Sequence, residues 1–119
     1  MEKPRDIDAR QAYEKTSDGR ALLVCAYPDE SVCREWLLEG AMTISELAHR
    51  EKELSRDQEL IFYDDEDGDA VARARSGEYA ERGFEHVRVL TGGVHDWKLS
   101  GYPLASETPP ENPPGPTAA

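Results

Sequence analysis

The 119-residue sequence lacks any long apolar run, and this absence argues against a membrane-spanning helix. Its longest strongly apolar run covers residues 21–26, whereas a spanning helix needs about 20 apolar residues. The first six residues contain no apolar stretch of the kind found in a secretory signal, so we expect no such signal. The length fits one domain and is too short for two ordinary hydrophobic cores.

Cysteine is also scarce, and the chain contains only Cys25 and Cys33. These residues form no C-x-x-C motif and have no histidine nearby at the spacing of a zinc site. The sequence therefore predicts neither a disulfide framework nor a zinc site. A reducing, cytoplasmic location is the corresponding expectation.

Positive charge is low, with 14 Lys and Arg residues against 25 Asp and Glu residues and a formal net charge of −11. Nucleic acids and anionic membrane surfaces select clusters of lysine and arginine. The balance of charge therefore excludes both as expected partners.

The last fifteen residues, 105–119, contain five of the eight prolines and no apolar side chain larger than alanine. Such a segment cannot bury enough apolar surface to offset the entropy lost on ordering. We predict a single domain over residues 1–104 and a disordered proline-rich tail over 105–119. The PxxP spacings in the tail could dock an aromatic groove, but a flexible tail is the favoured interpretation.

Between the termini, short apolar runs alternate with helical patterns. Residues 22–26 and 60–63 are continuous apolar runs, as expected for strands buried on both faces. Helical patterns cover 45–54, which opens with Ser45, and 69–82, where Asp69 is a candidate cap for the first turn. This alternation predicts an α/β fold with a parallel sheet and helices on both faces.

In such sheets ligands bind beyond the carboxyl ends of the strands, which directs attention to residues 25–28 and 64–69. Farther along, Gly92 and Gly93 are expected to allow a tight turn and the close packing of a helix. Trp97 and Tyr102 are expected to bury large apolar area.

Several motifs together match one known family. They are Ala21-Leu22-Leu23-Val24, Gly40-Ala41, Ser45-Glu46-Leu47, Glu81-Arg82-Gly83-Phe84, Val87-Arg88-Val89-Leu90, Gly92-Gly93, Trp97 and Gly101-Tyr102-Pro103. The pattern resembles a rhodanese (sulfurtransferase) domain over about residues 5–104. The resemblance implies a three-layer α/β/α fold with a mostly parallel five-stranded sheet, a role in sulfur metabolism and no cofactor.

The resemblance also implies an active-site loop over 64–69, which in the family begins with a nucleophilic cysteine. In this sequence Asp64 takes that position, and Asp69 takes the position of an arginine common late in the loop. A carboxylate is a poor nucleophile towards sulfane sulfur and cannot carry a persulfide. The loop contains five carboxylates, which would repel thiosulfate or phosphate; its residues are Asp64, Asp65, Glu66, Asp67, Gly68 and Asp69.

These observations predict a rhodanese-like domain that does not transfer sulfur and serves as a binding or regulatory module. The acidic loop is a candidate surface for a basic protein, and the resemblance adds a sulfur-carrier protein as a second type of partner.

The alternative is a sulfurtransferase that uses Cys25, which stands at the carboxyl end of a strand expected to neighbour Asp64. Nearby carboxylates raise the pKa of a thiol and slow its reactions, so a buried, unreactive Cys25 is favoured. Cys33 lies in a helical pattern and is expected to serve packing.

The acidic loop also allows a weak, irregular site for Ca²⁺ or Mg²⁺. An EF-hand is excluded because the twelfth position, counted from Asp65, is Ser76. The D-x-D-G pattern over residues 65–68 resembles haloacid-dehalogenase-type phosphotransferases, but that family needs a larger domain downstream than the roughly 50 residues present here. The sequence therefore assigns no metal ligands.

Overall fold

The computed structural model describes residues 5–27, 29–35, 37–64, 69–102 and 104. The predicted tail over 105–119 and four residues of the acidic loop, 65–68, lie outside the described residues. Among the helices described, none is both long and apolar enough to cross a membrane.

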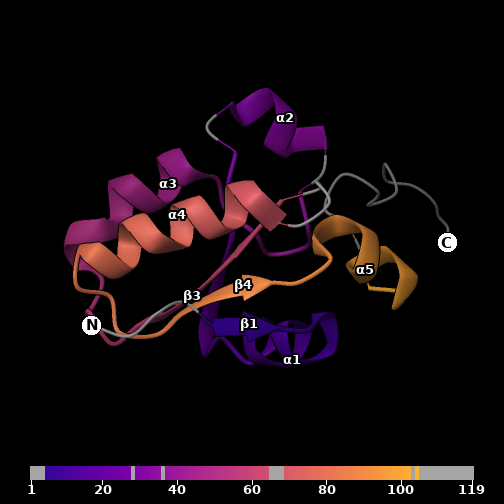
Figure 1. Cartoon of the computed structure of the whole chain (residues 1–119), viewed down its shortest axis with the longest axis horizontal. Coiled ribbons are helices and arrows are strands. Elements are labelled where there is room, and N and C mark those ends of the chain that lie inside the picture. The colour runs from indigo at the N-terminus through magenta and orange to yellow at the C-terminus, as the bar shows by residue number, and fades with distance from the viewer. Residues whose placement is uncertain (1–4, 28, 36, 65–68, 103, 105–119) are drawn as a thin grey trace, which may run out of the picture.

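A parallel sheet forms the centre of the fold (Figure 1). Its strands follow the order β1-β4-β3-β2 and are β1 (Arg5–Ile7), β2 (Ala21–Cys25), β3 (Glu59–Tyr63) and β4 (Val87–Leu90). The helices between and after them are α1 (Ala9–Ser17), α2 (Glu30–Glu35), α3 (Ile44–Arg50), the 3₁₀ turn η1 (Glu51–Glu53), α4 (Ala70–Glu81) and α5 (Gly93–Leu99). All three strand pairs are parallel, which confirms the predicted α/β class.

The described sheet has four strands, so the prediction of five is wrong in this detail. Beyond β2 there is a single bridge at Met42, whose N–H donates to Leu23 O at 2.9 Å and whose carbonyl accepts from Cys25 N–H at 2.8 Å. The chain cannot continue this pairing because the next residue, Thr43, already caps α3.

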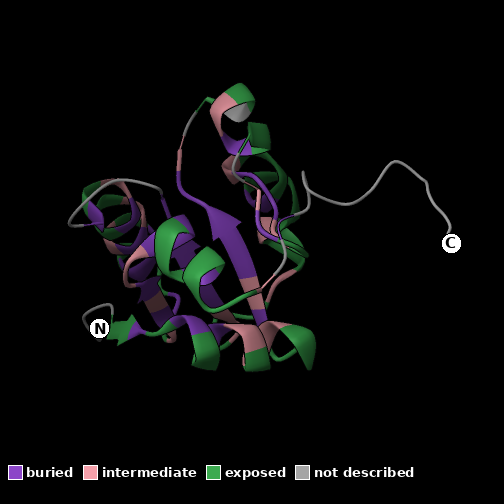
Figure 2. Cartoon of the chain, turned by 90° about the vertical axis from the view of Figure 1, so that its right-hand side faces the viewer, coloured by how far each residue is buried: buried purple, intermediate pink, exposed green. Residues whose placement is uncertain are grey.

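Strands β2 and β3 are buried on both faces, as their continuous apolar runs predicted (Figure 2). Alternating residues of β2 and β3 enter two separate cores. One core joins Leu23 and Ile61 to residues such as Trp97, and the other joins Val24 and Phe62 to helix residues that include Leu47, Tyr79 and Ala80. Figure 1 shows α3 and α4 on one side of the sheet and α1 on the other.

Helix α3 begins one residue earlier than its predicted start at Ser45, because the cap is Thr43. The Thr43 hydroxyl accepts the Glu46 N–H at 3.2 Å, and Glu46 Oε1 accepts the Thr43 N–H at 2.9 Å. This reciprocal capping box satisfies two backbone donors at once, which Ser45 could not do from inside the helix. The helix ends at Arg50, and η1 completes the predicted segment.

The aromatic residues near the end of the domain pack as expected. Tyr13 of α1 stacks on Tyr102 with ring centroids 4.2 Å apart, and the fully buried Trp97 meets both rings edge-on. This cluster joins α1 to α5 beneath the sheet.

Candidate functional site at the carboxyl ends of the strands

Asp64 directly follows β3, and its side chain is fully buried. Its Oδ2 accepts the backbone N–H of Ala72 at 2.8 Å, in the first turn of α4. A negative charge at a helix N-terminus is favourable because the backbone N–H groups there lack partners within the helix. Asp64 therefore caps α4 from the end of the neighbouring strand.

The backbone of Asp64 is held by the next helix. Its carbonyl accepts the N–H of Val94 at 3.1 Å, and Gly93 lies so close that a Cβ there would overlap the same carbonyl oxygen. Gly93 also has a φ of +50°, a conformation that side chains disfavour. The expected close packing at Gly93 is thus a contact between α5 and the candidate site.

Asp69 stands at the N-cap position of α4, but the prediction that its side chain caps the first turn is wrong. Asp69 has a left-handed backbone with φ +57°, which turns its carboxylate towards the β4–α5 turn. There Oδ2 accepts the N–H of Gly92 at 3.3 Å, while Oδ1 has no hydrogen-bond partner among the described residues. Asp64 provides the cap in its place.

Burial raises the pKa of the Asp69 carboxyl, and the nearby charge of Asp64 acts in the same direction. The Gly92 N–H and the cation of Arg73 oppose this rise. Arg73 lies on the first turns of α4 and also pairs with Asp6 at 2.9 Å. Sequence reasoning considered the acidic run by itself and missed Arg73, although its position four residues after Asp69 on a predicted helix was a usable signal.

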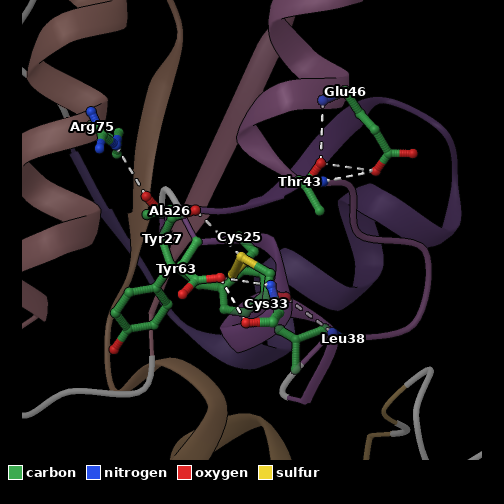
Figure 3. The surroundings of a disulfide bond; sticks show 11 residues. Cys25, Ala26, Tyr27, Cys33, Leu38, Thr43, Glu46, Tyr63 and Arg75 are labelled. Carbon is green, nitrogen blue, oxygen red and sulfur yellow. Dashed lines mark hydrogen bonds between the residues drawn. A yellow bond between two sulfur atoms is a disulfide. The ribbon is translucent and has the colours of Figure 1, made fainter.

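The two cysteines, Cys25 at the end of β2 and Cys33 in α2, form a disulfide with their Cα atoms 5.9 Å apart (Figure 3). The expectation that the chain has no disulfide is therefore wrong, and so is the assignment of Cys33 to packing alone. After β2 the chain folds back so that α2 lies over the end of its own strand, which brings together two residues only eight apart. Both side chains are fully buried.

The disulfide lies next to the candidate site because Cys25 pairs in register with Tyr63, the residue before Asp64. The expected proximity of these two strand ends is thus present. The Tyr63 hydroxyl accepts the N–H of Leu38 at 3.1 Å, and burial raises the pKa of this phenol well above its ordinary value. Tyr63 therefore ties the segment that follows α2 to β3 (Figure 3).

The remaining predicted loop residues, Asp65, Glu66, Asp67 and Gly68, lie outside the described residues. Within the part of the chain that is described, no three His, Cys, Asp or Glu side chains gather as a metal ion would require. The cation site stays a prediction. The expected cytoplasmic location also stays a prediction, and its argument from the absence of a disulfide no longer holds.

The geometry agrees with comparisons to known proteins. The family model of the rhodanese-like domain matches residues 2–100, and the chain therefore belongs to the rhodanese-like domain family. Among curated proteins there is no significant match.

Several solved structures are similar to this chain. A crystal structure of the Alr3790 protein from Anabaena sp. shares 25% sequence identity over 82% of this chain and 88% of that chain, with a TM-score of 0.69. A solution NMR structure of the rhodanese-like domain of Alr3790 has 24% identity, coverages of 97% and 87%, and a TM-score of 0.71. A rhodanese-related protein from Thermoplasma volcanium has 23% identity, coverages of 87% and 99%, and a TM-score of 0.64. These likenesses establish the fold.

Proposed function

We propose that this rhodanese-like domain does not transfer sulfur and acts as a binding or regulatory module. The observation that carries the proposal is the place of Asp64, whose buried carboxylate accepts a backbone N–H at the start of α4. The resemblance puts the family's nucleophilic cysteine at this position. Sulfur transfer needs a thiolate there, since a carboxylate cannot hold a persulfide.

The surroundings of Asp64 support the same conclusion. A helix N-terminus contributes only about half a positive charge, and here the Asp64 carboxylate already occupies it. Asp69 adds a second buried carboxyl nearby. An anionic sulfur donor such as thiosulfate would meet these groups at close range and be repelled.

The partner we propose is a basic protein, with a sulfur-carrier protein as the alternative drawn from the family. The chain has a formal net charge of −11, and the acidic loop holds five carboxylates within residues 64–69, of which Asp64 and Asp69 are buried. Such a concentration of one charge accelerates encounter with the opposite charge and suppresses contact with acidic proteins.

A turnover assay tests the proposal. The full chain is reduced, given thiosulfate and cyanide, and assayed for thiocyanate beside Asp64→Cys and Asp64→Asn. Asn keeps an oxygen that can accept the Ala72 N–H but cannot hold sulfur, so it is the matched control. We expect wild type and Asp64→Asn to equal the protein-free rate and Asp64→Cys to exceed it. A wild-type rate above the protein-free rate would overturn the proposal.

The second candidate function is a sulfurtransferase that uses Cys25. The register between Cys25 and Tyr63 favours it, because it puts a sulfur on the strand beside Asp64. This function requires the disulfide to be reduced first and the buried thiol to become accessible. Its signature is thiocyanate production that is lost in Cys25→Ser and retained in Asp64→Asn.

A further inference from the structure

Helix α2 is short, most of its described side chains are exposed, and the disulfide joins it covalently to the sheet. Among its side chains that the structure describes, only Cys33 is buried, while Ser31, Arg34 and Glu35 are exposed and Val32 is half-buried. The helix has six residues, far fewer than a peptide needs to remain helical alone. The bond from Cys33 to Cys25 links this short helix to the end of β2 (Figure 3).

The rest of the fold does not depend on this bond. Cys25 remains paired in the sheet through its backbone, since its N–H donates to Met42 O at 2.8 Å. The segment after α2 has its own anchor in the fully buried Leu38, whose N–H donates to the Tyr63 hydroxyl at 3.1 Å. Breaking the disulfide therefore removes the covalent link of α2 while Cys25 and Leu38 keep their own anchors.

We propose that Cys25 and Cys33 form a reversible thiol–disulfide site that takes electrons from a dithiol reductant and controls the position of α2. In the oxidised form α2 is held over the carboxyl ends of β2 and β3. In the reduced form α2 moves away and uncovers the buried ends of these strands beside Asp64. This inference goes beyond the proposed function and does not require it.

The exchange is balanced in atoms and electrons. A thiolate of the reductant attacks Sγ of Cys33, the sulfur–sulfur bond breaks, and Cys25 leaves as a thiolate. The second thiol of the reductant then attacks the mixed disulfide and releases Cys33. The protein gains two electrons and two protons, and the reductant ends as a disulfide. Cys33 is the expected point of attack because it lies on the short helix, whereas Cys25 lies in a paired strand.

Burial of the two cysteines limits the rate of this thiol–disulfide exchange. Both cysteines are fully buried, so a reductant reaches them only when α2 opens. Local opening of a short, poorly buried helix needs less free energy than global unfolding. The site is therefore reducible in the folded protein, but more slowly than an exposed disulfide.

The test uses the full chain, first oxidised in air and then treated with dithiothreitol. Free thiols are trapped with N-ethylmaleimide and counted by intact mass, and amide hydrogen exchange is measured in both states. We expect no labelled thiol before reduction and two after it. Exchange over residues 29–35 should rise at least tenfold on reduction, while exchange in β3 and β4 changes less than twofold.

Cys33→Ser and Cys25→Ser control for the reductant, and both should show the fast exchange of α2 with or without dithiothreitol. The proposal is overturned by two free thiols in the air-oxidised protein or by unchanged exchange in α2 after reduction. It is equally overturned by a loss of protection throughout the sheet, which would make the bond a staple of the whole fold. None of these readouts depends on sulfur transfer, so they separate this inference from the proposed function.

Discussion

Two neighbouring strand ends, at Cys25 of β2 and Asp64 after β3, are linked to the adjacent helices by different kinds of bond. Both side chains are fully buried. Cys25 is joined to α2 by a covalent bond, whereas Asp64 is joined to α4 by a hydrogen bond to the Ala72 N–H and to α5 through its backbone carbonyl. The disulfide at Cys25 depends on redox conditions, whereas the hydrogen bond at Asp64 depends on an oxygen atom that accepts the Ala72 N–H. The edge where a rhodanese-like domain is expected to react is thus occupied at both strands by structural links.

The largest effect is expected at the Asp64 side, from Gly93→Ala. The new Cβ would overlap the Asp64 carbonyl oxygen and would require a side chain at φ +50°. We expect a loss of about 2–4 kcal/mol in the free energy of unfolding, measured by urea denaturation. Gly77→Ala is the control, because Gly77 lies in α4 with open space around it. The Gly77→Ala change should stabilise the protein by about 0.5–1 kcal/mol. Equal losses of stability in the two variants would contradict the close approach of Gly93 to the Asp64 carbonyl oxygen.

The second-largest effect is expected from removal of the disulfide at Cys25. The disulfide closes a short loop, with a sequence separation of eight. Its removal by Cys33→Ser should lower the free energy of unfolding by about 2–3 kcal/mol through the added freedom of the unfolded chain. Dithiothreitol should lower the wild-type value by a similar amount and leave the variant unchanged. If dithiothreitol does not change the free energy of unfolding of the wild-type protein, the disulfide does not form in solution.

A smaller effect separates the charge of Asp64 from its role as acceptor. Asp64→Ala leaves the buried Ala72 N–H without its acceptor and should destabilise the fold by about 1–3 kcal/mol. Asp64→Asn retains an oxygen at the same place, and its loss should be clearly smaller. If both variants lose the same stability, the carboxylate contributes by charge and not by accepting this hydrogen bond.

The smallest effect is a dependence on pH at Asp69. Because burial raises the pKa of this carboxyl in the folded protein, the folded state holds its proton more tightly than the unfolded state. The stability that this group contributes is present at pH values below its unfolded pKa of about 4 and is lost as the pH rises through the folded pKa. Asp69→Asn, which keeps an acceptor for Gly92 N–H, should be more stable than wild type at pH 7. The difference should shrink towards pH 3, and a difference that is independent of pH would contradict the raised pKa.

The fold was predictable because β2 and β3 carry runs of apolar residues that only a sheet covered on both faces can bury. The position of Asp64 at a strand end followed from the same pattern, since β3 ends at Tyr63 and the next residue is Asp64. The sequence did not predict which N–H group donates a hydrogen bond to each of the carboxylates of Asp64 and Asp69. Asp69 has the ideal position for a cap, but its left-handed backbone turns it to Gly92 and leaves the capping to Asp64.

The disulfide was missed for a related reason. A separation of eight between Cys25 and Cys33 matches no recognised motif, and only the fold-back of α2 over β2 brings the two Cα atoms to 5.9 Å. The fifth strand was expected from the resemblance, but pairing stops at Met42 because the capping box of Thr43 and Glu46 starts α3 at once.

The most direct test of the central claim is the intact mass of the wild-type chain after incubation with thiosulfate, in the oxidised and the reduced state. If the domain does not transfer sulfur, both states keep the mass of the unmodified protein. One added sulfur on the reduced protein, absent from Cys25→Ser, would show a working nucleophile beside Asp64 and contradict the account.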